Sequence, residues 1–275
     1  MTNDDGIDSV GLHVLAREAS RFGEVTVVAP DREYSGSGAS LGTLTFDWPT
    51  VRKRPIEMLP DAPCWSVTGP PALCVMYAQL GAFGEPFDFI VSGINPGQNV
   101  GWSVYHSGTL GAALTGRNRG TSGLAVSLGF DGKEVEGQTW GQIVDGMNWE
   151  TGATVAATVL EGLLEDPPDH PVVVNLNIPN GELEDLVGWN EGVVGAEPPR
   201  RLTRGRLVEA ESDDDGQVFR LEMDWGAGRE LVEGTDAWLV ANKQVSITWL
   251  GHLIGTEPDP AQRKSVATRL DRLVR

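Results

Sequence analysis

The fold is decided by residues 1–29, which read MTNDDGIDSVGLHVLAREASRFGEVTVVA. From Asp8 to Phe22 the apolar residues recur at the three- and four-residue spacing of a helix with one buried face. The next run, Glu24-Val-Thr-Val-Val-Ala29, is rich in β-branched residues, which is typical of a strand buried in a parallel sheet. A helix followed by such a strand predicts an α/β fold and implies a further strand in front of the helix.

Two adjacent carboxylates, Asp4 and Asp5, stand before the predicted helix. Two such charges about 4 Å apart repel by about 1 kcal/mol in water, and by more at a partly buried site, unless a cation neutralises them. A divalent metal site and a solvated, frayed terminus are both open interpretations of these residues. Because only Met1 and Thr2 precede Asn3, we expect either a stub in place of the first strand or a true start codon further upstream.

The composition narrows the class of protein. A chain of 275 residues can form one large α/β domain with an appendage, or two small domains. The sequence has no signal peptide, and no apolar run approaches the roughly 20 residues that span a bilayer, so we expect a cytoplasmic protein without a membrane partner. Cys64 and Cys74 lie in no zinc-binding spacing and are expected to be reduced thiols.

The charge balance is strongly acidic, with 39 Asp and Glu against 21 Lys and Arg and a net charge of -18. Such a field repels polyanions, so no nucleic-acid polymer is expected as a partner, whereas a small anion remains possible beside a metal or a helix N-terminus. A negative surface with few lysines also suits a cytosol with molar salt, which predicts a halophilic protein. An ordinary acidic mesophilic protein is the alternative.

Strand and helix patterns alternate through the first two thirds of the chain, as in an α/β fold with a parallel sheet. Strand patterns lie at 41–48, 51–54, 64–67, 87–92, 124–128 and 172–178. Helical patterns lie at 70–80, 107–114 and 150–164. From about residue 181 the pattern changes to turns and strands, which are predicted at 206–211, 218–225, 234–240 and 244–250, the last two as a pair.

The last third of the chain contains one acidic cluster and one basic cluster. Asp213-Asp-Asp-Gly216 is predicted to be a solvated hairpin tip, with metal binding as the alternative. Ala261 to Val274 is predicted to be a helix rich in arginine and lysine. On an acidic protein such a helix indicates docking against an acidic surface of this subunit or a neighbour, or simply cations placed near a helix C-terminus.

Three polar loops follow predicted strands or open a helix, where open α/β sheets place ligands. Ser35 lies in the glycine-rich loop 30–40, and Asn95 lies in the loop 93–101. Ser107-Gly108-Thr109 opens a helix whose backbone N–H groups could hold a phosphate. Taken singly, the three segments are also compatible with a flexible connector, a turn and a serine N-cap.

Taken together, four motifs resemble the SurE family (survival protein E), which are metal-dependent 5'/3'-nucleotidases. They are Thr2-Asn-Asp-Asp-Gly6, Val28-Ala-Pro-Asp-Arg32 with Ser35-Gly36, Val91-Ser-Gly-Ile-Asn95 with Asn99 and Gly101, and Ser107-Gly-Thr109. The resemblance implies a Rossmann-like, three-layer, mostly parallel α/β core at 1–180. It also implies a β-rich extension with a terminal helix at 181–275, which would assemble a homodimer or homotetramer.

The resemblance also implies a site and a substrate. Its metal ligands fall on Asp4, Asp5, Ser35 and Asn95, its phosphate-binding helix entrance falls on Ser107, Gly108 and Thr109, and Asp4 and Asp5 are the expected catalytic residues. One divalent ion per subunit, Mg or Mn, would act on a nucleoside monophosphate. These four ligands are hard oxygen donors suited to either ion.

The sequence departs from the family pattern where substrate contacts are expected. Pro96 replaces an arginine after the loop asparagine, Trp102 and Ser103 replace an acidic pair, and Leu73 replaces an aspartate. The base preference and the choice between an attacking water and an aspartyl nucleophile stay open. A non-hydrolytic nucleotide-binding protein with the same loops is the alternative function, whereas a haloacid-type phosphatase would need Asp-x-Asp after an apolar strand.

Overall fold

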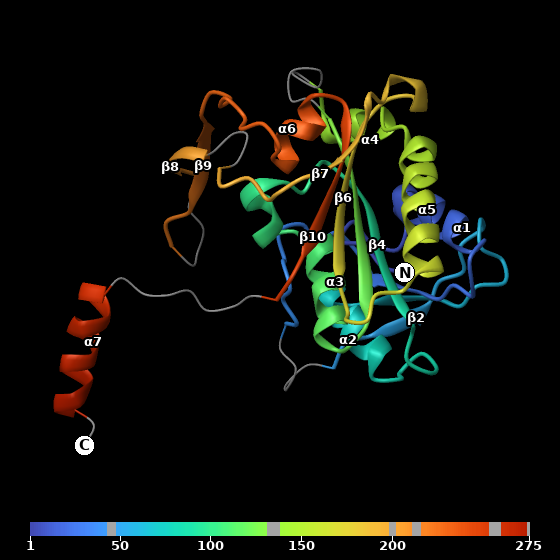
Figure 1. Cartoon of the computed structure of the whole chain (residues 1–275), viewed down its shortest axis with the longest axis horizontal. Coiled ribbons are helices and arrows are strands. Elements are labelled where there is room, and N and C mark those ends of the chain that lie inside the picture. Colours follow the sequence, from blue (N-terminus) through green and yellow to red (C-terminus); the bar gives the residue numbers. More distant parts are fainter. Residues whose placement is uncertain (43–47, 131–137, 198–201, 211–215, 253–259, 274–275) are drawn as a thin grey trace.

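The computed structural model describes residues 1–42, 48–130, 138–197, 202–210, 216–252 and 260–273 (Figure 1). The strands are β1 (Val27–Pro30), β2 (Val51–Lys53), β3 (Cys64–Val67), β4 (Phe89–Pro96), β5 (Ser122–Gly129), β6 (Val173–Pro179), β7 (Gly188–Glu191), β8 (Leu202–Glu209), β9 (Phe219–Trp225) and β10 (Gln244–Leu250). The helices are α1 (Val10–Ala19), α2 (Pro71–Gln79), α3 (Gly108–Asn118), α4 (Trp140–Asp145), α5 (Trp149–Glu165), α6 (Asp236–Ala241) and α7 (Pro260–Leu273), with 3-10 turns η1 (Gly101–Tyr105) and η2 (Leu183–Asp185). The predicted α/β class is confirmed.

Apart from the two-stranded pair β8-β9, the strands form a larger and a smaller sheet. The larger sheet has the order β4-β5-β6-β10-β7, in which β4, β5 and β6 are parallel and β10 runs antiparallel to β6. The smaller sheet has the order β1-β3-β2, in which β1 and β3 are parallel. The predicted mostly parallel arrangement is therefore confirmed. The exceptions are β10 and its parallel neighbour β7, which run against β6, and β2, which runs against β3.

The segment Met1–Thr2 joins the two sheets. The Thr2 N–H donates to the Val91 carbonyl at 3.0 Å, and the Gly93 N–H donates to the Thr2 carbonyl at 2.9 Å. On the other side, the Val28 N–H donates to the Met1 carbonyl at 2.9 Å. This pair of residues therefore lies in parallel register between β1 and β4, as the strand expected before α1.

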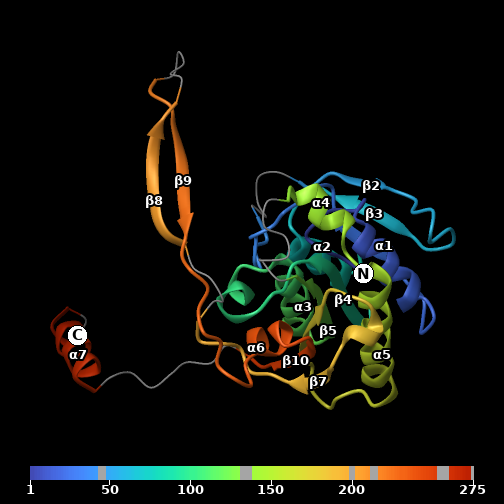
Figure 2. The ribbon, with the colours of Figure 1, turned by 90° about the horizontal axis from the view of Figure 1, so that it is seen from above.

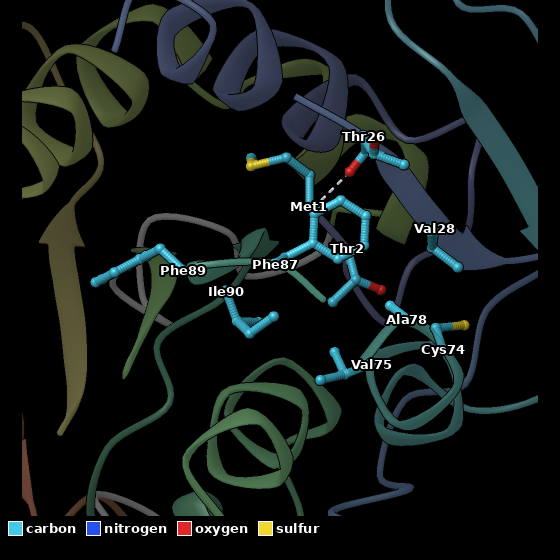
Figure 3. Close-up of a pocket in the computed structure, with 10 residues that line it drawn as sticks. All are labelled: Met1, Thr2, Thr26, Val28, Cys74, Val75, Ala78, Phe87, Phe89 and Ile90. Atoms are coloured by element: carbon cyan, nitrogen blue, oxygen red, sulfur yellow. Dashed lines mark hydrogen bonds between the residues drawn. The ribbon is translucent and has the colours of Figure 1, made fainter. Parts of the chain in front are cut away.

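A small, mostly apolar pocket borders this junction (Figure 3). It is lined by residues of Met1–Thr2, β1, α2 and β4 together with the segments that lead into β1 and β4. The Met1 amino group lies beside it and donates to the Thr26 carbonyl at 2.8 Å.

Helices cover both faces of the larger sheet, giving three layers (Figure 2). Val91, Leu124 and Val126 pack with buried residues of α1 and α5 on one face. Ile90 and Ala125, which alternate with them along the strands, pack with α2 and α3 on the other face. The period of two in the strands and the single apolar stripe of each helix therefore build two cores around one sheet.

One predicted strand is wrong. Residues 234–240 were expected to pair with 244–250, but α6 occupies Asp236–Ala241, and β10 pairs with β6 and β7 instead. The Thr235 hydroxyl caps this helix by accepting from the Trp238 N–H. Short apolar runs fit a strand or a helix equally well, and here the N-cap decides. Two other predictions, part of the strand at 41–48 and the acidic triplet at 213–215, fall outside the described residues.

The segment after residue 180 divides between the sheet and two projecting elements. β7, α6 and β10 belong to or pack against the larger sheet. The hairpin β8–β9 and the predicted basic helix, which is confirmed as α7, lie outside the three layers (Figures 1 and 2). Across the described ranges, no helix combines the length and the apolar character needed to cross a bilayer.

A substitution in α1 tests the packing of this helix on β4 and α5. A Cβ added at Gly11 would lie 2.5 Å from the Ile94 carbonyl oxygen and 2.7 Å from the Trp149 ring. Gly11→Ala is therefore expected to lower the free energy of unfolding by about 1–3 kcal/mol, although alanine is the better helix former. Urea denaturation measures the change. Gly23→Ala is the control, because its Cβ would meet no atom within 4 Å, and equal effects of both substitutions would contradict this packing.

Candidate functional site

The loop Asn3–Gly6 lies at the carboxyl end of β1. The Ile7 N–H donates to the Pro30 carbonyl at 2.8 Å, and the Tyr34 N–H donates to the Asp4 carbonyl at 2.7 Å. Gly6 has φ of +97°, and a Cβ there would approach the Arg32 backbone to 3.1 Å. Glycine is needed at this position for both reasons, so the loop is held closely against the segment that follows β1.

Asp4 is packed against the beginning of α3. Its side chain is 3% exposed, and Oδ1 accepts a hydrogen bond from the Thr109 hydroxyl at 2.6 Å. A Cβ on Gly108 would lie 2.8 Å from Asp4 Oδ2, so only glycine lets the helix entrance approach the carboxylate this closely. Burial raises the pKa of Asp4, while the Thr109 hydroxyl and the backbone of Asp4, Thr109 and Gly108 oppose that rise.

Asp5 carries the strongest electrostatic conflict of the site. Burial, the charge of Asp4 and the charge of Glu33 together raise the pKa of Asp5 to about 8. Its Oδ2 is buried and accepts no hydrogen bond from any group in the part of the chain that the structure describes. A bound cation would relieve the repulsion and supply the missing partner, so the paired carboxylates fit a divalent metal.

The structure connects Ser35 and Asn95 to this loop less directly. Ser35 is exposed, and its hydroxyl donates to the Glu33 carboxylate at 2.8 Å. Asn95 is half-buried, and its Nδ2 donates to the Gly97 carbonyl at 2.6 Å. Asn95 was expected in the loop 93–101, but it lies near the end of β4, where it pairs with Ser127 of β5. Because Thr2 and Ser92 are neighbours in a parallel bridge, Asp5 and Asn95, each three residues further on, lie toward the same edge of the sheet. The four-ligand set stays a prediction.

The donor set is of the oxygen type throughout. Over the described ranges, no three His, Cys, Asp or Glu side chains form a group that could hold a metal. A metal at this site would therefore depend on the two carboxylates together with hydroxyl and amide oxygens, which is a set that Mg or Mn accepts.

The helix entrance has a serine N-cap, as one of the two interpretations of Ser107 expected. The Ser107 Oγ accepts from the Leu110 N–H at 3.0 Å, and Ser107 is 5% exposed. Thr109 is fully buried and directed at Asp4. The structure thus brings Asp4, Gly108 and Thr109 together, while phosphate binding by Ser107, Gly108 and Thr109 stays a prediction.

Two residues near the carboxylates escaped the sequence analysis. Ser37 has a buried Oγ with no hydrogen-bond partner within the described segments, 2.8 Å from the position of a Cβ on Gly108. Glu33 adds negative charge beside Asp5 and binds Ser35. Both belong to the same glycine-rich loop as Ser35. Because that loop has no regular period, its sequence could not show which hydroxyl lies beside Asp4.

The sequence of the chain is similar to those of known proteins over the segments that form this site. A family model described as "Survival protein SurE" matches residues 1–197. This chain belongs to the SurE family. The predicted resemblance is therefore confirmed, and the match includes the carboxylate pair, both polar loops and the entrance of α3.

Relatives within the SurE family are similar over nearly the whole chain. A protein of Clostridium botulinum (strain Kyoto / Type A2), named 5'-nucleotidase SurE, is 31% identical over 248 residues, which are 90% of each chain. A protein of the same name from Halorhodospira halophila is 33% identical, over 90% of this chain and 89% of the relative. The crystal structure of the SurE protein from Aquifex aeolicus aligns with a TM-score of 0.69 and 29% identity, covering 98% of both chains.

Removing the charge of Asp5 is expected to stabilise the metal-free SurE protein. Folding raises the pKa of Asp5 from 3.8 to about 8, so between these values the folded state keeps a proton that the unfolded chain releases. The free energy of unfolding contributed by this group therefore falls as the pH rises through that window. Asp5→Asn cannot ionise, and it should be more stable than the parent by about 1 kcal/mol or more at pH 8.

Urea denaturation in the presence of a chelator, at about pH 5 and about pH 8, measures this difference. Asp8→Asn is the matched control, because it removes the same charge from a side chain that is 73% exposed and forms a surface ion pair with Arg54. If Asp5→Asn and Asp8→Asn show the same pH dependence, the strain attributed to Asp5 is refuted.

Proposed function

We propose that this SurE chain is a phosphoric monoester hydrolase that converts nucleoside 5'-monophosphates to nucleoside and phosphate. The observation that carries the proposal is the contact between the buried carboxylate of Asp4 and the entrance of α3, where Asp4 meets Thr109 and Gly108. Relatives named 5'-nucleotidase SurE support the same activity. Action on 3'-monophosphates is part of the proposal, since the family resemblance implies it.

The proposed cofactor is one divalent ion per subunit, Mg or Mn, held by Asp4, Asp5, Ser35 and Asn95. The lack of a partner for Asp5 Oδ2 among the described residues, and the raised pKa of both carboxyls, support this assignment. When bound there, a divalent ion would supply positive charge to neutralise the phosphate and to activate water.

The residues of the chain have separate roles in this proposal. Thr109 holds Asp4 in position through a hydrogen bond of 2.6 Å. The first N–H groups of α3 point out of a helix that has no acidic residue in its first turn, so they attract the phosphate and stabilise charge that develops on it. Burial and the neighbouring charges of Asp4 and Glu33 raise the pKa of Asp5, and a bound cation would favour its carboxylate form, which would serve as a base toward water.

The substrate is a small anion and not a nucleic-acid polymer, because the net charge of -18 repels long polyanions. The same charge supports a halophilic protein, and the lack of a membrane-crossing helix in the described residues is compatible with the proposed cytoplasmic location.

Release of phosphate from AMP and GMP, with Mg or Mn added back to chelated protein, tests the activity. The parent protein should turn over in low or molar salt, and Asp5→Asn should lose about a hundredfold or more of kcat/KM because a metal ligand and base is removed. Asp8→Asn, which removes an exposed charge between that loop and α1, should keep the parent's rate. Binding of AMP without turnover in either salt would instead identify a non-hydrolytic nucleotide-binding protein.

The proposed assembly is a homodimer or homotetramer formed through residues 181–275. Apolar side chains are exposed on the projecting hairpin and on α7, among them Leu207, Leu221, Met223, Val266 and Leu270. A two-stranded hairpin is only marginally stable by itself, so both elements gain by packing against another subunit.

Deleting residues 261–275 is expected to shift the mass measured by light scattering toward that of a monomer. The deletion removes α7 with its exposed apolar and basic side chains but leaves the larger sheet complete. The circular dichroism of the shortened protein should confirm that its core is folded. An unchanged mass would contradict the role given to this helix.

A further inference from the structure

Asp236, the first residue of α6, is a fully buried carboxylate outside the catalytic pair. Its Oδ2 accepts from the Gly101 N–H at 2.9 Å. Its Oδ1 accepts from the N–H groups of Gly195 at 3.0 Å and of Ala237 at 2.8 Å. A buried charge is costly unless it is hydrogen-bonded, and these three donors come from three separate segments of the chain. The carboxylate therefore joins the loop at Gly101, the segment at Gly195 and the beginning of α6 through hydrogen bonds.

Gly101 is the position where the loop after β4 turns into η1. It has φ of +54°, and a Cβ there would lie 2.9 Å from the Glu197 carbonyl oxygen. The backbone is thus pressed against the segment around 195–197 while its N–H is held by Asp236. The direction in which η1 leaves the sheet depends on this contact.

A second set of hydrogen bonds holds the same loop two residues earlier. The Asn99 N–H donates to the Asn177 Oδ1 at 2.7 Å, and the Asn175 Nδ2 donates to the Asn99 carbonyl at 2.9 Å. The Asn99 Nδ2 donates to the Ser127 Oγ at 2.9 Å. Side chains of β5 and β6 therefore hold the loop at Asn99. Two residues later, Asp236 holds it at Gly101.

The far end of η1 reaches the candidate site. The His106 carbonyl accepts from the Gly38 N–H at 3.0 Å, which fastens the loop that contains Ser35 and Ser37. The next residue, Ser107, caps α3, whose Thr109 binds Asp4. A shift of η1 would therefore move the entrance of α3 together with the glycine-rich loop 30–40, which is called the serine loop below.

We propose that Asp236 is a positioning residue for the hydrolytic site, acting through Gly101 and η1 on the serine loop and on the entrance of α3. The inference rests on the proposed function, because it names what aligns that site. It assigns no contact between Asp236 and the substrate. The carboxylate matters because it offers acceptors on two oxygens, one for the loop and one for the segments at Gly195 and Ala237.

The substitution Asp236→Asn tests whether the hydrogen bonds of the carboxylate, and not only the packing of a buried side chain, position the loop. The amide keeps the size of the side chain but replaces one acceptor oxygen with an NH2 group, which cannot accept from a backbone N–H. The orientation that keeps two bonds directs the remaining oxygen at Gly195 and Ala237 and leaves the Gly101 N–H without its acceptor. The loop and η1 should then be released while α6 stays capped.

Hydrogen exchange followed by mass spectrometry on the metal-free protein is the first measurement. Peptides that cover residues 97–107 should exchange about tenfold faster in Asp236→Asn than in the parent. Gln79→Leu is the matched control. Gln79 is also buried and makes three hydrogen bonds, but it joins α2 to Phe87 and Thr121, before β4 and before β5. Its substitution should leave exchange at 97–107 unchanged.

Steady-state kinetics on the metal-loaded proteins, well below their unfolding temperatures, is the second measurement. Asp236→Asn should lower kcat about tenfold and change KM less, because the site is misaligned and not emptied. Gln79→Leu should keep the parent's kcat. Parent-like exchange at 97–107, or faster exchange with parent-like kcat, would each overturn the positioning role.

Failure of the proposed function would be recognised separately, as absence of turnover in the parent protein itself. In that case Mn titration by calorimetry replaces kinetics. Weaker Mn binding in Asp236→Asn than in Gln79→Leu, together with the faster exchange, would still support the inference, and equal binding would overturn it.

Discussion

The parallel bridge between Thr2 and Ser92 is the interaction on which the site depends. Hydrogen bonds of Met1 and Thr2 to β1 and β4 join the smaller sheet to the larger one and direct the following residues to the carboxyl edge of both. The first residues beyond that edge are Asn3, Asp4 and Asp5, of which Asn3 and Asp4 are buried. The same few backbone hydrogen bonds therefore organise the sheet and deliver the carboxylates to the entrance of α3.

The carboxylate pair lowers the stability of the metal-free fold at the candidate site. Buried Asp4 and half-buried Asp5 lie side by side, with Glu33 near them, in a protein that already carries a net charge of -18. The fold holds them through Thr109, Gly6 and Gly108, positions where a larger or less polar side chain would relieve the strain by moving the loop. The repulsion between two carboxylates held this close would be relieved by a bound cation.

Much of the architecture could be predicted from the sequence, because buried parallel strands and amphipathic helices have distinct periods. Eight elements could be predicted from their own apolar periodicity, because each is long enough to fit one period better than the other. They are the strands β1, β4, β5 and β6 and the helices α1, α2, α3 and α5. The strand predicted at 234–240 was wrong, because a run with only four consecutive apolar residues, 237–240, fits either period, and the Thr235 cap decided for α6. The carboxylate pair and the SurE family could be recognised because their motifs are contiguous.

What the sequence by itself determined is the chemistry: an acidic α/β protein with two adjacent carboxylates, oxygen-donor loops after strands, and a small-residue helix entrance. Only the tertiary structure decided which of these groups meet. It brought Asp4 to Thr109 across 105 positions, left Ser35 exposed beside Glu33, buried the Ser37 hydroxyl near Gly108, and placed Asp236 under Gly101. The physical reason is that contacts between distant segments depend on how strands are ordered and loops are packed, which no local period of the sequence encodes.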